Sequence, residues 1–338
     1  MPANSMKLKE INTELVKSVL KKQDYCTKSS IAKATSLSVA TCGNILKELI
    51  ATGEVLEIDL KPSTGGRPAR RFVYNENYAY VAVLYARKEG DYKSLTCVVS
   101  NMIGIHVYET YLELEDISIK EFDDAIHMLL KLYPNIKVLG IGIPGVVRQG
   151  IIDICDFKKL SGEPLQQHLE KKFNLQVIIE NDVNSTAYGF FHRTQYTDAE
   201  SMVYIYYPID ENPGAGIIVN GQILLGQSNF AGEVSFLPLG VNPKNQSDIQ
   251  KNKELFADLV AKTIMSINCV INPKSIILSG FCFTEQMIES IKTLLHLLSP
   301  KGHLPELIIE DDIHDSYIYG LTSMALTKLS CNIQLIEK

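Results

Sequence analysis

Apolar positions in the first part of the chain recur at the spacing of an amphipathic helix in three segments. The first covers roughly residues 9–21, where one stripe is formed by Ile11, Leu15, Val19 and Leu20. The second begins after Thr27, and the third begins after Ser38 and runs to about residue 51. We therefore predict three short helices before the first strand.

The residues that flank these segments favour helix ends. Thr27 and Ser38 are good N-caps because their hydroxyl oxygens accept hydrogen bonds from free amides of the first turn. Gly53 is suited to ending the third helix, because glycine tolerates the left-handed backbone found there. A short helix, a tight turn at Ser36-Leu37 and a second capped helix are typical of a helix-turn-helix.

The third helix has an apolar face and a face of small and polar residues. The pattern places Cys42, Ile45, Leu46 and Leu49 in the core. The opposite face, with its cap, consists of Ser38, Val39, Thr41, Gly43, Asn44 and Lys47, a composition that fits a helix entering the major groove. Asn44 could pair with an adenine edge and Lys47 could contact phosphate. Gly43 is costly in a helix, and close approach to DNA would explain it.

Two alternating segments, residues 54–58 and 72–74, predict a hairpin with a basic tip after the helices. The connecting sequence KPSTGGRPARRF supplies further candidate DNA contacts, namely Gly65, Gly66, Arg67, Arg70 and Arg71. The glycines permit close backbone approach. An arginine held extended before Pro68 suits a narrow minor groove, and the other arginines suit phosphates. The first 75 residues are thus predicted to be a winged helix-turn-helix.

Charge is divided unevenly between this segment and the rest of the chain. Residues 1–75 carry a net charge of +5 and the remainder −11, within a total of −6. A basic N-terminal segment followed by an acidic remainder indicates that the N-terminal segment binds a polyanion. Two alternatives remain, because a charged face can be merely solvated and a helix-turn-helix can also bind protein.

Composition limits the class of protein. With 338 residues, 46% hydrophobic and 21% charged, the chain suits two or three globular units. No apolar run is long enough for a membrane helix, and the N-terminal residues lack the apolar stretch of a signal peptide. Seven scattered cysteines without a CxxC pair argue against disulfides and structural zinc. We expect a cytoplasmic protein with no membrane partner.

The body alternates short apolar strands with helical stretches, as α/β folds do. The predicted strands are residues 80–84, 96–100, 137–143, 177–180, 202–206, 216–219 and 275–278. A last helix is expected near residues 316–328, where it would pack back on the first half of the body.

Several body motifs together resemble the ROK family (repressors, open reading frames and kinases), specifically its repressor branch. They are GIGIPGVV at 140–147, EPLQQHLEKKFNLQVIIENDVNSTAYG at 163–189 and PGAGIIVNGQILLGQSNFAGEVSF at 213–236. The resemblance implies an actin-like ATPase fold of two α/β lobes around a cleft. It divides the chain into a DNA-binding domain (1–75), a first lobe (76–185, completed by a helix at 316–330) and a second lobe (186–315).

The elements that the family's kinases use for ATP are degenerate. After the first strand, Leu84 stands where the resemblance implies an Asp, and the glycines of the first phosphate loop are missing. Asp210-Glu211-Asn212-Pro213 replaces the second loop, and Gly280-Phe281-Cys282-Phe283 replaces the glycine run of the adenosine loop. Phosphate cradles need backbone amides of such loops. We therefore expect no kinase activity and no cofactor.

The family's zinc motif is lost but its sugar motif is retained. Phe236 stands in place of the motif histidine, and the residues that follow contain no Cys or His, so a tetrahedral zinc site is not expected. The resemblance implies that Asn181, Asp182, Glu233 and, more loosely, Asp156 contact an effector. The alternative is that Asn181 and Asp182 only cap a helix that begins near Asn184.

We therefore expect a repressor of carbohydrate-metabolism genes that binds an operator duplex as a homodimer or homotetramer and responds to a sugar or sugar phosphate in the cleft. Two-fold DNA half-sites require at least a dimer. Two further hypotheses stay open. The body could be an oligomerisation scaffold without a ligand, or the protein could be an active sugar kinase with an added DNA-binding domain.

Overall fold

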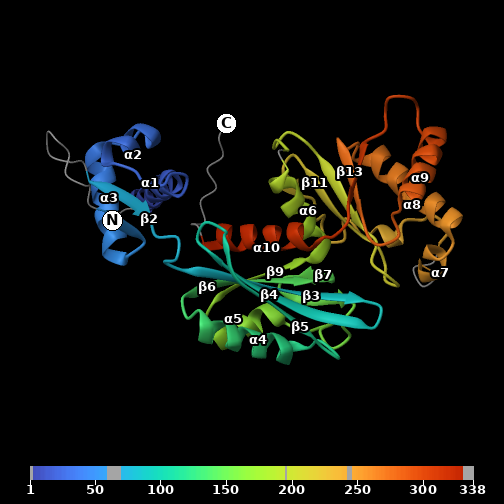
Figure 1. The fold of residues 1–338 in the computed structure, drawn as a ribbon, viewed down its shortest axis with the longest axis horizontal. Coiled ribbons are helices and arrows are strands. Elements are labelled where there is room, and N and C mark those ends of the chain that lie inside the picture. Colours follow the sequence, from blue (N-terminus) through green and yellow to red (C-terminus); the bar gives the residue numbers. More distant parts are fainter. Residues whose placement is uncertain (1–2, 59–69, 195, 242–245, 330–338) are drawn as a thin grey trace.

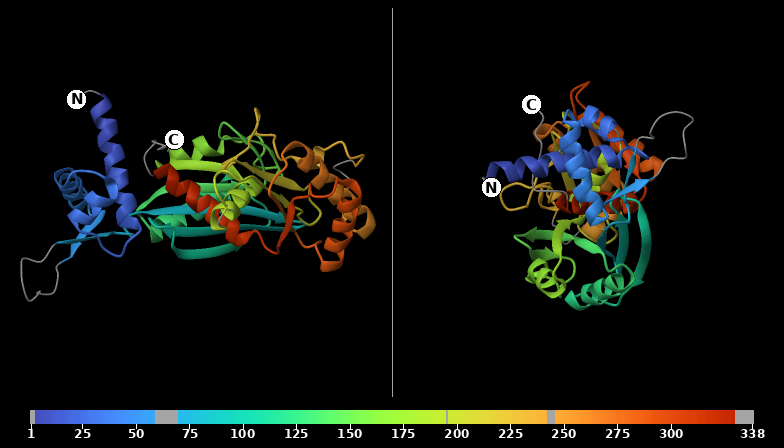
Figure 2. Two further views of the ribbon diagram at one scale, coloured as in Figure 1. Left: turned by 90° about the horizontal axis from the view of Figure 1, so that it is seen from above. Right: turned by 90° about the vertical axis from the view of Figure 1, so that its left-hand side faces the viewer.

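The structure is a computed structural model that describes residues 3–58, 70–194, 196–241 and 246–329. Its elements form an N-terminal unit at one end and two five-stranded sheets that make up the body (Figure 1). The view from above shows the same elongated arrangement, with the N-terminal unit beyond one end of the body (Figure 2, left).

The N-terminal unit consists of three helices and a two-stranded antiparallel sheet. The helices are α1 (Ala3–Lys21), α2 (Lys28–Thr35) and α3 (Val39–Thr52), and the strands are β1 (Val55–Ile58) and β2 (Arg71–Tyr74). The predicted first helix was wrong at its start, because α1 begins six residues before residue 9. Residues 6–10 are all exposed, so no apolar stripe marks them. No proline or glycine interrupts the helix there.

The predicted helix ends are confirmed. The Thr27 hydroxyl accepts a hydrogen bond from the Ser30 amide at 3.1 Å. The Ser38 hydroxyl accepts one from the Thr41 amide at 3.0 Å. Gly53 ends α3 with a φ of 81°, and Ser36 turns the chain between α2 and α3 in the left-handed conformation. These local bonds fix the angle at which α3 leaves the turn.

A buried ion pair ties the three-helix core to the small sheet. Glu54 lies just before β1, not within the strand as predicted, and its carboxylate is 2.9 Å from the Lys17 Nζ. The Tyr74 hydroxyl donates to the same carboxylate at 3.0 Å. Around this group pack the side chains of Val16, Leu20, Ile31, Leu46, Leu49, Val55 and Phe72. The pair therefore joins α1, β1 and β2 at one point.

The first body sheet has the strand order β5-β4-β3-β6-β9. Its strands are β3 (Tyr80–Glu89), β4 (Tyr92–Asn101), β5 (His106–Glu113), β6 (Ile136–Ile143) and β9 (Gln176–Asn181). The strands β3, β6 and β9 are parallel to one another. Helices α4 (Ile119–Leu132) and α5 (Leu165–Phe173) cover one face through a common apolar core (Figure 1). A hairpin of β7 (Gly145–Arg148) and β8 (Ile151–Cys155) follows β6.

The second body sheet has the order β12-β11-β10-β13-β14. Its strands are β10 (Met202–Tyr206), β11 (Gly214–Val219), β12 (Gln222–Ile223), β13 (Ser275–Ser279) and β14 (Glu306–Glu310). The 3-10 helix η1 (Val234–Phe236) follows β12. A short helix α7 (Gln246–Gln250) precedes α8 (Lys253–Val270) and α9 (Glu285–Leu298), and the latter two pack on the outer face of the sheet.

Each predicted body strand corresponds to a strand of the structure. The first two predictions fall within β3 and β4, and the others coincide with β6, β9, β10, β11 and β13 to within two residues at each end. The sequence did not reveal that β3 continues to Glu89 and pairs with β4 over its whole length.

Helices α6 (Asp182–Arg193) and α10 (His314–Leu329) lie between the two sheets and cross at close distance (Figure 1). A Cβ added to Gly189 would lie 1.8 Å from the Ser316 carbonyl oxygen, and one added to Gly320 would lie 1.9 Å from the Ser185 carbonyl oxygen. Glycine at both positions lets the two backbones touch. The crossing joins the two halves of the body.

The far end of α10 reaches the N-terminal unit. Leu329 is part of the apolar cluster around the N-terminal core, together with Met102 from the turn between β4 and β5. The Leu326 side chain lies against the same turn at Gly104. One helix therefore contacts both the centre of the body and the N-terminal unit.

Candidate functional site

The exposed face of α3 presents the residues predicted to contact DNA. Ser38, Val39, Asn44 and Lys47 are exposed, while the four residues predicted for the core are buried. Thr41 and Gly43 are only half-buried, because the Thr41 hydroxyl bonds to the Ser38 hydroxyl at 2.8 Å and Gly43 faces α2. A Cβ on Gly43 would meet only the Lys28 Nζ, at 3.8 Å. Packing within the chain therefore does not require glycine at this position.

The small sheet carries two of the predicted arginines. Arg70 is exposed and pairs with Glu57 at 2.8 Å. Arg71 begins β2, one residue earlier than the predicted strand, and its guanidinium stacks on the Tyr25 ring at 3.9 Å. The other predicted contacts of the hairpin tip, Gly65, Gly66 and Arg67, lie outside the described residues. Both described arginines sit at the base of the hairpin, beside α2.

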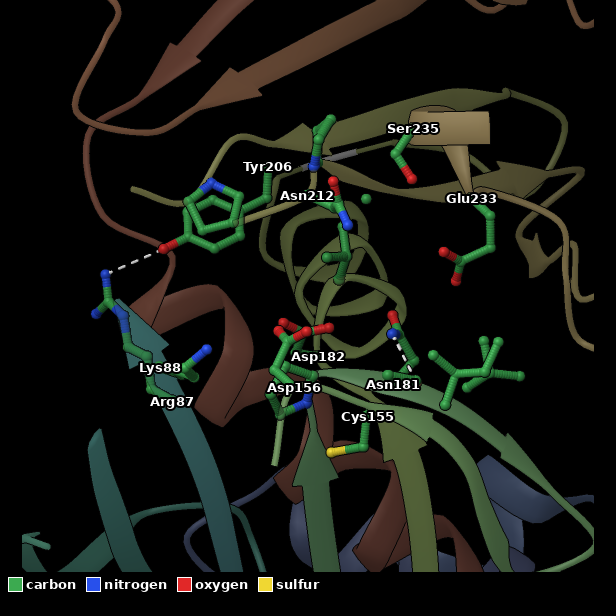
Figure 3. A pocket seen from close by; sticks show the side chains of 18 of the residues that line it. Arg87, Lys88, Cys155, Asp156, Asn181, Asp182, Tyr206, Asn212, Glu233 and Ser235 are labelled. Atoms are coloured by element: carbon green, nitrogen blue, oxygen red, sulfur yellow. Dashed lines mark hydrogen bonds between the residues drawn. The ribbon is translucent and has the colours of Figure 1, made fainter. Parts of the chain in front are cut away.

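A cavity of about 140 Å³ lies where the ends of the two sheets meet. Asn181, Asp182, Asp156 and Glu233, the four predicted effector contacts, all line it. They come from different elements: the end of β9, the start of α6, the segment after β8 and the segment before η1. In Figure 3 the carboxyl groups of Asp156 and Asp182 lie close together, and Glu233 faces them from the second sheet.

Burial and mutual repulsion raise the pKa values of the three cavity acids. Burial, and then the negative charge of Asp156, raises the pKa of Asp182 to about 7. Burial, and then the charge of Glu211, raises the pKa of Asp156 to about 6. The pKa of Glu233 is also raised, by burial and by Asp156. The carboxyls of Asp156 and Asp182 therefore exchange protons near neutral pH and can both donate and accept hydrogen bonds.

Asn181 has the structural role that the sequence left open as an alternative. Its side-chain oxygen accepts from the Asn184 amide at 2.9 Å and so caps α6, while its amide group donates to the Gly145 carbonyl at 3.0 Å. Asp182 differs, because it is the first residue of α6. The helix begins there, not near Asn184, so Asp182 is not the cap. Asn181 positions the site, and the Asp182 carboxyl borders the cavity.

Polar contacts link the two sheets beside the cavity. Lys88 of β3 forms an ion pair with Glu211 of the loop after β10. The Tyr206 hydroxyl donates to Glu89 at 2.7 Å and accepts from Arg87 at 3.4 Å, a contact drawn in Figure 3. Arg87 also pairs with Glu89 at 2.6 Å. The strand β3 continues as a regular strand through Arg87 and Lys88 to Glu89.

Aromatic side chains form another part of the cavity wall. Phe236, in place of the motif histidine, lines the cavity and is 56% exposed. Its ring centroid is 5.4 Å from that of Phe230, which is also exposed. Over the described ranges, no group of three or more His, Cys, Asp and Glu side chains is arranged to hold a metal ion.

Sequence reasoning missed several members of the site. Tyr317 of α10 lines the cavity, and its buried hydroxyl has no hydrogen-bond partner among the described residues. Arg87, Lys88 and Tyr206 were not predicted to have a role. Nothing near Tyr317 in the sequence distinguishes it from a core aromatic. The consecutive charges at residues 87–89, in a strand otherwise buried, were the one available signal.

Comparisons with known proteins agree with the fold and the motifs. A sequence model described as ROK family matches residues 94–245. The xylose repressor of Caldicellulosiruptor bescii is 29% identical over 242 residues, which cover 68% of this chain and 59% of that protein. The chain thus spans about three fifths of that curated relative. No described helix is long and apolar enough to cross a membrane.

Solved structures show the same architecture. A ROK family transcriptional regulator, described as a homologue of the Escherichia coli MLC protein, has a TM-score of 0.69 at 18% identity and covers 95% of this chain and 99% of its own. The ROK hexokinase from Thermus thermophilus has a TM-score of 0.62 at 15% identity and covers 74% of this chain and 99% of its own. At such identities the likeness shows the fold alone, which is the predicted actin-like ATPase fold. The sequence matches add that this chain is similar to ROK family proteins, through residues 94–245 and through the xylose repressor named above.

Proposed function

We propose that the chain is a DNA-binding transcriptional regulator, a repressor of carbohydrate-metabolism genes, whose DNA affinity responds to a sugar or sugar phosphate in the cleft. The N-terminal unit is the winged helix-turn-helix, and the protein acts in the cytoplasm as a homodimer or homotetramer. The relative and the solved structure named above as repressor and transcriptional regulator support this proposal.

The exposed face of α3 is the observation on which the proposal depends. Asn44 and Lys47 stand on the side of α3 that is turned away from the N-terminal core, and neither side chain has a hydrogen-bond or ion-pair partner among the described residues. The helix is short enough to enter a major groove, and the paired caps at Thr27 and Ser38 fix it against α2. Arg70 can reach phosphate because its ion pair with Glu57 is exposed and therefore weak.

Helix α10 supports a sugar response. Ile313 and Tyr317, at its start, line the cavity. Leu329, at its end, packs against the N-terminal core. A ligand that favours one arrangement of the cleft would thereby favour one arrangement of the DNA-binding units. The contacts of Arg87, Lys88 and Tyr206 between the sheets favour a regulator over a kinase, since they take the place of phosphate-binding loops.

The experiment is fluorescence anisotropy of the full chain on a duplex from its own upstream region. Lys47→Ala should lower affinity about tenfold on every sequence and reduce the salt dependence, because a phosphate contact is lost. Asn44→Ala should weaken mainly the specific site. Lys262→Ala, which removes an exposed lysine of α8, is the matched control and should leave DNA affinity unchanged. Failure to retain any duplex at low salt, or unchanged retention after removing the charges of Arg67, Arg70 and Arg71, refutes the proposal.

The sugar response is tested on the same complex. Addition of sugars and sugar phosphates should shift the anisotropy midpoint for at least one compound. A chain that binds DNA but responds to none of them would be a DNA-binding regulator with a scaffold body, and the effector part of the proposal would be wrong.

A further inference from the structure

We propose that the cleft accepts an uncharged sugar and rejects the phosphate ester of the same sugar, with Phe236 packing against the C–H face of the sugar ring. The inference rests on the proposed sugar response and narrows it from two ligand classes to one. It follows from which charges of the cavity wall are free and which are already paired.

Among the described residues that line the cavity, the cations are Arg87 and Lys88, and both are paired with carboxylates. Asp156, Asp182 and Glu233 all face the space, and each is raised in pKa by burial and by a neighbouring acid. Because the site already disfavours its own negative charges, a phosphate with a charge between about −1.5 and −2 would be repelled. Salt screens such repulsion less inside a partly buried cavity than on a surface.

The two cations in the cavity wall are already engaged. Lys88 pairs with Glu211, and only about a fifth of either side chain is exposed. Arg87 pairs with Glu89 at 2.6 Å and contacts Asp312 at 3.5 Å. A phosphate could bind either group only by displacing a partly buried carboxylate, which would then lack its partner.

The positive end of α6 is also occupied. The start of a helix attracts anions through its free amides. Here Asn181 accepts from one of these amides at 2.9 Å, and the carboxyl of Asp182 lies in the first turn. A phosphate would have to compete with both groups.

An uncharged sugar fits the same wall. Carboxyl groups that titrate near neutral pH can donate to and accept from hydroxyls. Tyr317 adds an aromatic side chain to the wall, and its buried hydroxyl has no hydrogen-bond partner among the described residues. Phe236, exposed beside Phe230, offers an apolar surface for the ring C–H groups. The wall thus combines carboxyl groups that can hydrogen-bond to sugar hydroxyls with an aromatic surface that can contact the sugar ring.

The test is isothermal titration calorimetry of the full chain with matched pairs at low salt and pH 7.5. The probes are glucose and glucose 6-phosphate, N-acetylglucosamine and its 6-phosphate, and ribose and ribose 5-phosphate. We expect at least one free sugar to bind and its phosphate to bind at least tenfold more weakly. Equal or tighter binding of the phosphate overturns the inference and leaves the sugar response standing. Binding of neither member in all pairs overturns both, while DNA binding is judged separately by anisotropy.

Two sets of variants test the cause. Glu211→Gln removes the ion-pair partner of Lys88. The ratio of the dissociation constants for the sugar phosphate and the free sugar should then fall at least threefold. Adding Lys88→Ala should restore the original ratio. Glu200→Gln is the matched control, because Glu200 also pairs with a lysine, Lys274, but does not line the cavity. A preference that Glu211→Gln leaves unchanged contradicts the argument from paired cations.

The aromatic contact has its own variants. Phe236→Ala should lower the affinity for the free sugar at least fivefold, and Phe236→Tyr should retain most of it because the ring is kept. Phe281→Ala is the matched control, since Phe281 is exposed but lies outside this cavity. Full affinity in Phe236→Ala refutes the packing of the sugar on this ring.

Discussion

Removal of the Asp182 charge should stabilise the protein at high pH. Burial and Asp156 raise the pKa of this carboxyl from 3.8 to about 7 in the folded chain. The proton is therefore held more tightly in the folded than in the unfolded state. Its stabilising contribution is complete below pH 3.8 and is lost as the pH rises through 7. Asp182→Asn, which cannot ionise, should not lose this contribution.

The size of the effect follows from the shift in pKa. Since one pKa unit corresponds to about 1.4 kcal/mol, the difference between 3.8 and about 7 sets an upper limit of about 4 kcal/mol. Water in the cavity screens part of this, so we expect Asp182→Asn to be about 2 kcal/mol more stable than the parent at pH 8. Most of the difference should be absent at pH 4, where the parent carboxyl is protonated in the folded state.

The assay is urea denaturation followed by far-ultraviolet circular dichroism, repeated between pH 4 and 8. Asp153→Asn is the matched control, because Asp153 is an exposed aspartate on the neighbouring strand β8 and should show little change. A variant no more stable than the parent at pH 8, or one with the same advantage at every pH, would show that the cavity does not strain this carboxylate.

Three further changes test other parts of the chain. Gly320→Ala should cost about 3 kcal/mol of stability in thermal denaturation, because its Cβ would lie 1.9 Å from the Ser185 carbonyl oxygen; an unchanged melting temperature would contradict the close crossing. Gly43→Ala, a helical glycine with space around it, should add about 1 kcal/mol and yet weaken DNA binding in anisotropy; unaltered DNA affinity would mean that the glycine does not serve close approach. Glu54→Ala should cost about 2 kcal/mol, because Lys17 and the Tyr74 hydroxyl lose their common partner; a tolerant melting curve would show that the pair is dispensable.

Local features were predictable from the sequence because the bonds that make them lie within a few residues. Thr27 and Ser38 cap helices through amides three positions further on, and Gly53 ends α3 by its own backbone conformation. The start of α1 was not predictable from the apolar stripe, since residues 6–10 are exposed and carry no such stripe. The body strands were predictable from their apolar runs, although the polar end of β3 was not.

The site was predictable only as far as its motif. Asn181 and Asp182 are adjacent in the sequence and Glu233 belongs to a second motif, so their convergence followed from the family resemblance. The division of roles between Asn181 and Asp182 depends on where α6 begins, which the sequence did not fix to the residue. Tyr317 and the Lys88–Glu211 pair join segments more than a hundred residues apart, and no local pattern reveals such pairings.

The crossing of α6 and α10 at Gly189 and Gly320 leaves no side chain between the two backbones. Where long side chains separate two helices, rotamer changes can accommodate small displacements of one helix without moving the other. The glycine contact between α6 and α10 has no side chains that could rearrange in this way. A tilt at the start of α6, where Asp182 borders the cavity, must therefore be passed to α10 nearly undiminished. Since Leu329 at the other end of α10 packs against the apolar cluster of the N-terminal unit, a shift of α10 at the cavity displaces a side chain that contacts that unit.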